Sequence, residues 1–178
     1  MMQRRAVFLD RDGTINYNVS YCRTLDEFHL LPETAGAVKA LNRAGFLVVV
    51  ITNQSGVARG LFSEETLWRI HEYMQLQMTQ EGARIDRIYY CPHRDEDDCR
   101  CRKPRPGLLL RASAELSVSL DRSFMVGDSI SDVEAGIAAG CRTVMLNDGW
   151  SLGNTKVRLA DYQTCSIKDA VAWILRKP

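Results

Sequence analysis

Short apolar runs alternate along the chain with longer segments whose apolar residues recur every three or four positions. The runs themselves do not alternate with polar residues, which is typical of strands buried on both faces of a sheet. Helical periodicity is clearest over residues 63–80, where Ser63 can cap the first turn. The apolar stripe of that segment consists of Leu67, Ile70, Met74 and Met78. The predicted strands are 6–9, 46–51, 86–91, 124–126 and 143–146, and the predicted helices are 32–44, 63–80, 106–116, 131–139 and 166–177.

This alternation of strands and helices predicts an α/β fold in which helices cover both faces of a central parallel sheet. The 178 residues, of which 46% are hydrophobic, suit a single domain, 1–178, with a sizeable core. In such sheets ligands bind beyond the carboxyl ends of the strands. Polar clusters that follow a predicted strand are therefore the candidates for a functional site.

Charge and hydropathy narrow the classes of partner. The net charge of +1 argues against a strong nucleic-acid or membrane footprint. The longest purely apolar run, 46–51, is far too short to cross a bilayer, and the N-terminus has no signal-peptide pattern. We expect a cytoplasmic monomer that acts on a small molecule, without nucleic-acid or membrane partners.

The first polar cluster, 10–14, directly follows the apolar run 6–9. Its two carboxylates, Asp10 and Asp12, are two residues apart, and Mg²⁺ prefers such oxygen ligands together with phosphate. An aspartate can also attack phosphorus and form an aspartyl-phosphate. Taken alone, the Asp12-Gly13 pair is equally typical of an ordinary turn at a polar strand end.

Three further clusters follow strand ends or begin helices. Thr52 and the backbone amides that follow it could hold phosphate oxygens. Lys103 lies just before a helix whose N-terminus favours anions. Asp128 could complete a magnesium site, while Asp132 either orients its neighbours or is a charge in the first helical turn. Each cluster also has an ordinary explanation as a solvated loop.

A second metal site is indicated by three cysteines and one histidine within eleven residues. The ligands would be Cys91, His93, Cys99 and Cys101, with the spacing C-x-H-x5-C-x-C. Three thiolates and an imidazole fit a closed tetrahedral Zn²⁺ site, which is structural because no coordination position remains for substrate. We expect this zinc loop, residues 91–103, to order the segment that carries Arg102 and Lys103.

The four clusters resemble, in order, spacing and strand context, the motifs of the haloacid dehalogenase (HAD) phosphotransferase superfamily. The resemblance implies a three-layer Rossmann-like fold and assigns roles to individual residues. Asp10 would be the nucleophile and Asp12 the general acid and base, while Thr52 and Lys103 would bind the transferring phosphoryl group. Asp10, Asp128 and the backbone carbonyl of Asp12 would coordinate Mg²⁺.

The zinc loop and the short gaps between motifs narrow the resemblance further. Neither gap where HAD enzymes insert a cap domain is long enough for an independent core, so we expect no cap. Capless enzymes with such a loop resemble the D-glycero-D-manno-heptose-1,7-bisphosphate phosphatases and the histidinol-phosphate phosphatases. Segments 53–60, 89–93 and 99–107 favour the heptose branch, although the zinc loop is shorter than in some heptose enzymes and leaves the preferred anomer open.

By resemblance, the reaction removes the C7 phosphate from heptose 1,7-bisphosphate in nucleotide-heptose and lipopolysaccharide precursor synthesis. The expected substrate-binding residues are Asn53, Gln54, Ser55, Arg59 and Arg102. Arginine holds phosphate in a bidentate way, so Arg59, Arg102 and Arg105 are candidates for the second, non-reacting phosphate.

Three alternatives remain. A histidinol-phosphate phosphatase should offer acidic neighbours to its cationic substrate, yet Arg59 is the one charged residue in 53–60. A phosphatase for nucleic-acid ends should carry a basic stripe, which the balanced charge disfavours. A zinc-stapled binding module without activity should have lost at least one catalytic residue, and all are present.

Overall fold

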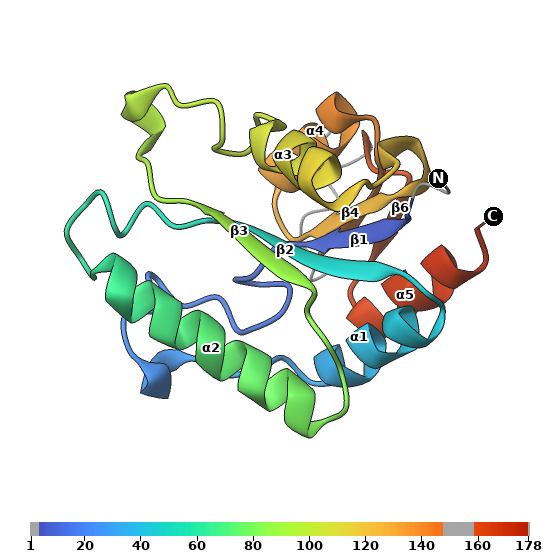
Figure 1. The fold of residues 1–178 in the computed structure, drawn as a ribbon, viewed down its shortest axis with the longest axis horizontal. Coiled ribbons are helices and arrows are strands. Elements are labelled where there is room, and N and C mark those ends of the chain that lie inside the picture. The colour runs from blue at the N-terminus through green and yellow to red at the C-terminus, as the bar shows by residue number, and fades with distance from the viewer. Residues whose placement is uncertain (1–3, 148–158, 178) are drawn as a thin grey trace.

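The computed structural model describes residues 4–147 and 159–177 and has a central sheet of six parallel strands (Figure 1). The strand order is β3-β2-β1-β4-β5-β6, and every neighbouring pair is parallel. The strands are β1 (Ala6–Leu9), β2 (Leu47–Asn53), β3 (Arg87–Cys91), β4 (Phe124–Gly127), β5 (Arg142–Leu146) and β6 (Tyr162–Thr164). This arrangement confirms the predicted α/β class with a Rossmann-like parallel sheet.

Helices cover both faces of the sheet, as Figure 1 shows. They are α1 (Thr34–Arg43), α2 (Glu64–Gln80), α3 (Gly107–Leu116), α4 (Ile130–Ala139) and α5 (Ile167–Leu175), with short 3-10 turns at Leu25–Glu27, Asp95–Asp97 and Leu120–Arg122. Strand β1 illustrates the two cores, because successive side chains point to opposite faces. Val7 and Leu9 pack with residues of α1, α2 and α5, whereas Ala6 and Phe8 pack with residues of α3 and α4.

Local sequence signals explain several element ends. The Ser63 hydroxyl accepts a hydrogen bond from the Thr66 amide at 3.1 Å and caps α2, as predicted. Helix α4 begins one residue earlier than predicted, because Ser129 and Asp132 form a reciprocal capping box. Strand β2 continues two residues beyond its apolar run, to Asn53. The added strand β6 was not predicted, since its three half-buried residues form no apolar run.

The two segments where a cap domain would be inserted are short in this structure. Residues 10–33 and 92–106 contain no helix longer than a single 3-10 turn. A single capless domain over 1–178 remains a prediction, and its residues 1–3, 148–158 and 178 lie outside the described ones. Within the described parts of the chain, no helix has the length and apolar character that crossing a membrane requires.

Candidate active site

The carboxyl ends of β1, β2 and β4 surround a cavity of about 390 Å³. Residues from all four predicted motifs line it, which requires the sheet to bring together segments more than a hundred residues apart. The predicted residues in its lining are Asp10, Asp12, Thr52, Asn53, Gln54, Ser55, Lys103 and Asp128. Arg59 and Arg102 are not in that lining.

Lys103 is buried among acidic groups at the floor of the site. Its Nζ lies 2.8 Å from Asp10 Oδ1 and 2.6 Å from Asp132 Oδ1, and it donates a hydrogen bond to the carbonyl oxygen of Ile51 at 2.8 Å. Only 2% of its side chain is exposed. Burial alone would lower the pKa of Lys103, but the charges of Asp10 and Asp132 outweigh burial and raise it. The lysine therefore stays charged.

The site carries more negative charge than one lysine balances. Carboxylate oxygens of Asp10, Asp128 and Asp132 all lie within 4.8 Å of one another. Burial, reinforced by the charge of Asp132, raises the pKa of Asp10 from 3.8 to about 7 and that of Asp128 to about 6. The raised pKa values indicate that Lys103 alone does not balance the three ionised carboxylates, and a divalent cation with a preference for oxygen ligands fits this need.

Asp132 contributes to the site although the sequence left its role open. Its side chain is fully buried, and its Oδ2 accepts hydrogen bonds from the amide and the hydroxyl of Ser129 at 3.0 and 2.7 Å. Its Oδ1 pairs with Lys103. Asp132 therefore caps α4 and at the same time holds the lysine.

Gly13 explains how the first motif approaches the fourth. It has φ of +80°, and a Cβ atom at this position would lie 1.9 Å from Asp128 Oδ2. Both the backbone conformation and the close contact therefore require glycine. The turn after Asp12 can pass directly beside Asp128 for this reason.

Gln54 connects two of the predicted site residues. Its Nε2 lies 2.9 Å from both Asp12 Oδ2 and Thr52 Oγ1. Asp12 also accepts hydrogen bonds from Asn16 and from the buried guanidinium of Arg11. Neither Arg11 nor Asn16 was predicted.

The side chain of Asn53 is bound to the backbone of Lys103. Its Oδ1 accepts from the Lys103 amide, and its Nδ2 donates to the Lys103 carbonyl, both at 3.1 Å. This pair of hydrogen bonds joins the end of β2 to the lysine loop. Asn53 was predicted to border the sugar, and it lines the cavity while it makes this contact.

A smaller hollow of about 210 Å³ adjoins the site and shares Lys103 with it. Arg94, Arg102 and Arg105 line this hollow. Arg102 pairs with Asp95 and donates to the carbonyl of His93 at 3.4 Å, which ties it to the zinc loop.

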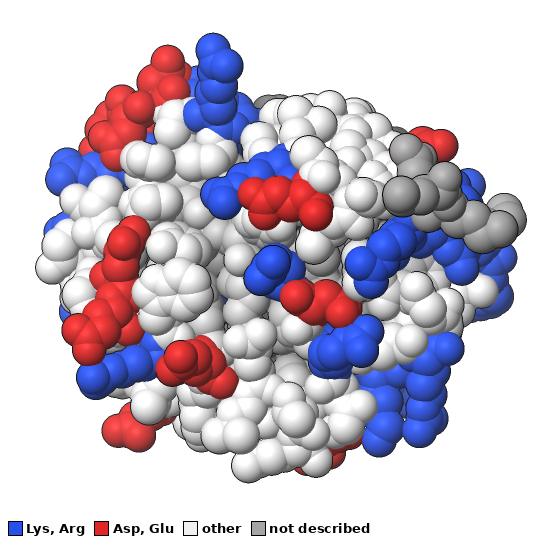
Figure 2. All heavy atoms as spheres, in the orientation of Figure 1, with Lys and Arg blue, Asp and Glu red and all other residues white. Residues whose placement is uncertain are grey.

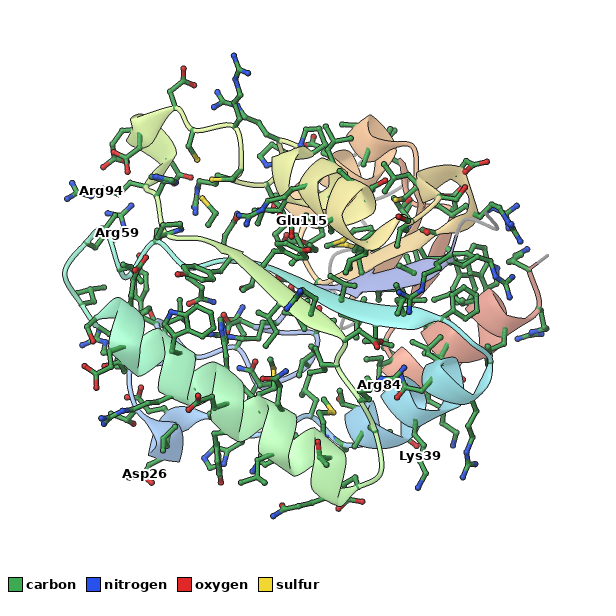
Figure 3. The ribbon with its side chains drawn as sticks, viewed as in Figure 1. Asp26, Lys39, Arg59, Arg84, Arg94 and Glu115 are labelled. Atoms are coloured by element: carbon green, nitrogen blue, oxygen red, sulfur yellow. The ribbon has the colours of Figure 1, made fainter. Side chains whose placement is uncertain are left out.

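Arg59 lies on the exposed tip of the segment after β2, beside Arg94 (Figure 3). Arg94, which the sequence analysis did not single out, donates to the carbonyl of Ala58 at 2.8 Å. It thereby joins the zinc loop to the segment that carries Arg59. Over the face shown in Figure 2, acidic and basic side chains are interspersed.

The predicted zinc ligands form one cluster. Cys101 Sγ lies 3.2 Å from Cys91 Sγ, 3.4 Å from Cys99 Sγ and 3.3 Å from His93 Nδ1. All four ligand atoms lie within 4.8 Å of one another, and none of the three cysteines is in a disulfide. With bonds of about 2.0–2.3 Å, the ligands of a tetrahedral zinc ion are separated by roughly 3.5–3.8 Å. The separations here are slightly shorter, so the four ligands need only small outward shifts to hold such an ion.

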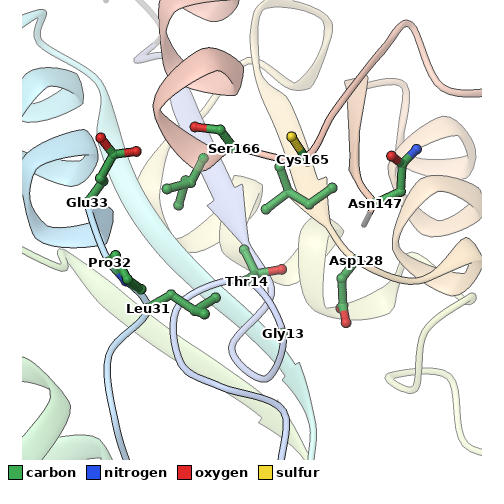
Figure 4. A pocket seen from close by; sticks show the side chains of 11 residues that line it. Gly13, Thr14, Leu31, Pro32, Glu33, Asp128, Asn147, Cys165 and Ser166 are labelled. Atoms are coloured by element: carbon green, nitrogen blue, oxygen red, sulfur yellow. The ribbon is translucent and has the colours of Figure 1, made fainter. Parts of the chain in front are cut away.

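A second cavity, of about 490 Å³, lies on the other side of the first motif (Figure 4). Asp128 lines both this cavity and the one that contains Lys103, whereas Gly13, Thr14, Asn147 and Cys165 line this one alone. Among the described residues that line it, the charged side chains, Glu33 and Asp128, are both acidic. A phosphate group is therefore better matched by the cavity that contains Lys103.

Comparison with known proteins agrees with the geometry of the site. The HAD-hydrolase-like family model matches residues 100–167. The chain is 40% identical over 173 residues to the D-glycero-beta-D-manno-heptose-1,7-bisphosphate 7-phosphatase of Pasteurella multocida, covering 93% of this chain and 94% of that protein. It is 37% identical to the Escherichia coli K12 protein of the same name, covering 96% and 87%.

A solved structure is similar over nearly the whole chain. It is the D,D-heptose 1,7-bisphosphate phosphatase from B. bronchiseptica, complexed with magnesium and phosphate. The TM-score is 0.90 at 32% sequence identity, with 98% of this chain and 99% of that chain covered.

Proposed function

Because this chain belongs to the D-glycero-β-D-manno-heptose-1,7-bisphosphate 7-phosphatase family of HAD hydrolases, we propose that it removes the C7 phosphate of that sugar bisphosphate. It is a phosphoric monoester hydrolase by family. The observation that carries the proposal for the site is the cavity in which Lys103, Asp10, Asp12 and Asp128 meet. The histidinol-phosphate alternative has no support among these relatives.

We propose the following roles for the residues of the cavity. Asp10 attacks phosphorus and forms an aspartyl-phosphate, which splits one difficult step into two. Asp12 protonates the sugar oxygen as it leaves and then takes a proton from the water that hydrolyses the intermediate. Lys103 and Thr52 hold the phosphoryl oxygens, where negative charge redistributes in the transition state.

The carboxylates fit Mg²⁺, which Asp10, Asp128 and the backbone carbonyl of Asp12 would hold. When bound, Mg²⁺ neutralises charge on the transferring phosphoryl group. The relative from B. bronchiseptica was crystallised with magnesium and phosphate, which supports the same choice here. The raised pKa of Asp10 is the independent support from this chain.

The second phosphate of the substrate would occupy the arginine-lined hollow beside Lys103. Arg102 borders this hollow, and its guanidinium can bind phosphate once it shares or leaves Asp95. We propose that Asn53, Gln54 and Ser55 face the sugar between the two phosphates, with Arg59 at the outer rim. Zn²⁺ at the Cys/His cluster would hold this rim in place and take no part in chemistry.

We further propose that the chain acts as a cytoplasmic monomer in the synthesis of nucleotide-heptose for lipopolysaccharide. A phosphate-release assay with Mg²⁺ tests the proposal on the α- and β-anomers of heptose 1,7-bisphosphate and on histidinol phosphate. We expect the β-bisphosphate to have the highest kcat/KM and Asp10→Asn to show no turnover on any of them. A preference for histidinol phosphate would assign the chain to the rival activity.

A further inference from the structure

Arg11 is a charged side chain with no exposed surface, located between the two aspartates of the first motif. Its Nε lies 3.2 Å from Asp12 Oδ1, and its Nη2 lies 2.9 and 2.8 Å from Oδ1 and Oδ2 of the same carboxylate. A buried guanidinium is costly unless its donors are bound. The fork of Arg11 is therefore committed to Asp12 on the side away from the cavity.

His71 of α2 supports Arg11 from behind. Its Nε2 lies 3.3 Å from Arg11 Nη1, and the ring is 2% exposed. Because a guanidinium donates and never accepts, Nε2 must be the acceptor and the ring must be neutral. Burial and then the charge of Arg11 lower the pKa of His71 to about 3, which agrees with this assignment.

Two further hydrogen bonds fix the orientation of the Asp12 carboxylate. Asn16 donates to Oδ1 at 2.9 Å and Gln54 to Oδ2 at 2.9 Å, and 23% of the Asp12 side chain stays exposed. Both oxygens are thus fixed by three donor side chains, from the turn after β1 and from the end of β2. Through its contact with Arg11, His71 links these hydrogen bonds to the middle of α2, sixty residues away in the chain.

We propose that Arg11 and His71 are positioning residues that fix the Asp12 carboxylate for proton transfer to the leaving group. This inference rests on the role of Asp12 in the proposed function. Neither residue touches the substrate, because Arg11 is fully buried and His71 lies behind it. Displacement of an acid by a fraction of an ångström impairs proton transfer without removing the nucleophile or the phosphate-binding groups.

The dependence of rate on the leaving group separates positioning from general structural support. A sugar or phenol oxygen needs protonation as it leaves, whereas p-nitrophenolate is stable as an anion. The ratio of kcat/KM for p-nitrophenyl phosphate to that for phenyl phosphate therefore measures proton transfer in the step up to Asp10 phosphorylation. These aryl phosphates also make the test independent of the sugar that the enzyme uses.

The decisive variants are His71→Leu, which removes the acceptor, and His71→Gln, whose amide oxygen can replace it. We expect His71→Leu to lower kcat/KM for phenyl phosphate about 10- to 100-fold, which is part of the rate enhancement of about 10²–10⁴ that general acid–base catalysis contributes. The kcat/KM for p-nitrophenyl phosphate should change less than about threefold. His71→Gln should restore most of the loss. Met78→Leu, in the same helix stripe, is the matched control and should change neither substrate.

Two further variants keep the test conclusive. Arg11→Lys retains the charge without the fork and should reproduce the leaving-group effect, even if His71→Leu does not fold. Asp12→Asn is the reference and should show the largest effect. Equal losses on both substrates for the Arg11 and His71 variants, with the reference effect present, would overturn the positioning role alone. Absence of the effect in Asp12→Asn would overturn the acid role of Asp12, and this inference with it.

Discussion

Asparagine in place of the proposed nucleophile Asp10 should stabilise the metal-free protein at alkaline pH. Burial and the charge of Asp132 raise the pKa of Asp10 from 3.8 to about 7, despite the ion pair with Lys103. The folded state therefore binds this proton more tightly than the unfolded chain does. The stability contributed by protonated Asp10 is fully present below about pH 4 and is lost as the pH rises through 7.

The magnitude follows from the same pKa values. A tenfold change in proton affinity corresponds to about 1.4 kcal/mol, so ionised Asp10 destabilises the metal-free fold by about 4 kcal/mol at pH 8. Asparagine has a similar shape without the charge and should recover much of this energy. For a chain of this length the gain corresponds to roughly 10 °C in Tm.

The difference in stability is measured by thermal unfolding of the wild type and Asp10→Asn from pH 4.5 to 8.5. Each protein is unfolded first with a magnesium chelator and then with excess Mg²⁺. Comparing the two proteins cancels the titration of the groups that do not interact with Asp10, whereas Asp132 and Lys103, which do interact with it, contribute to the measured difference. Without Mg²⁺, we expect the Tm of the variant to rise relative to that of the wild type as the pH increases. Added Mg²⁺ should narrow or reverse this difference in Tm, because it binds the folded wild type and stabilises it by mass action. A variant that is no more stable at pH 8.5 without metal would refute the reasoning that Lys103 alone leaves the charge of ionised Asp10 insufficiently balanced.

Two further predictions concern the zinc loop and the second phosphate. Wild-type protein should contain one zinc ion per chain, and Cys99→Ser should reduce the zinc content, lower Tm and impair activity indirectly. Metal analysis measures the zinc content and thermal unfolding measures Tm. Wild-type protein that contains no zinc when prepared without chelators would exclude the site. Arg102→Ala should lower kcat/KM for the bisphosphate about ten- to a hundredfold, the value of a charged hydrogen bond, with a smaller loss on a monophosphate. Arg59→Ala, at the exposed rim, is the matched comparison and should lose less; equal losses on the two substrates would remove the second phosphate from the arginine hollow.

The fold could be predicted from the sequence because its strands are continuous apolar runs. A run such as 46–51 has no polar face, so it indicates a strand covered by helices on both sides, and β2 lies inside the sheet between β3 and β1. Strand β6 could not be predicted in the same way. Its residues are half-buried, and its pairing with β5 depends on where α5 folds back onto the sheet.

Likewise, the parts of the site that follow from local sequence patterns could be predicted, whereas those that depend on long-range contacts could not. Three of the four motifs lie at the ends of β1, β2 and β4, so their convergence is a consequence of a parallel sheet, whereas Lys103 precedes α3 and reaches the site from the loop after β3. The role of Asp132 depends on burial against Lys103, which no local pattern specifies. The contact of Arg11 with His71 joins residues sixty apart. One signal was available in the sequence, since His71 lies four residues after Leu67 and three before Met74, a spacing that places it on the buried face of α2.

Lys103 lies at the end of the predicted zinc loop, but different contacts hold the lysine and the predicted zinc ligands in place. The side chain of Lys103 is fixed by Asp10 and Asp132, and its backbone is fixed by Asn53 at the end of β2. None of these contacts passes through the metal cluster. Arg102, by contrast, contacts Asp95 and the carbonyl of His93, a predicted zinc ligand, so its position depends on the loop. Loss of zinc should therefore disturb recognition of the second phosphate, seen in KM, before it disturbs the phosphoryl-transfer step, seen in kcat.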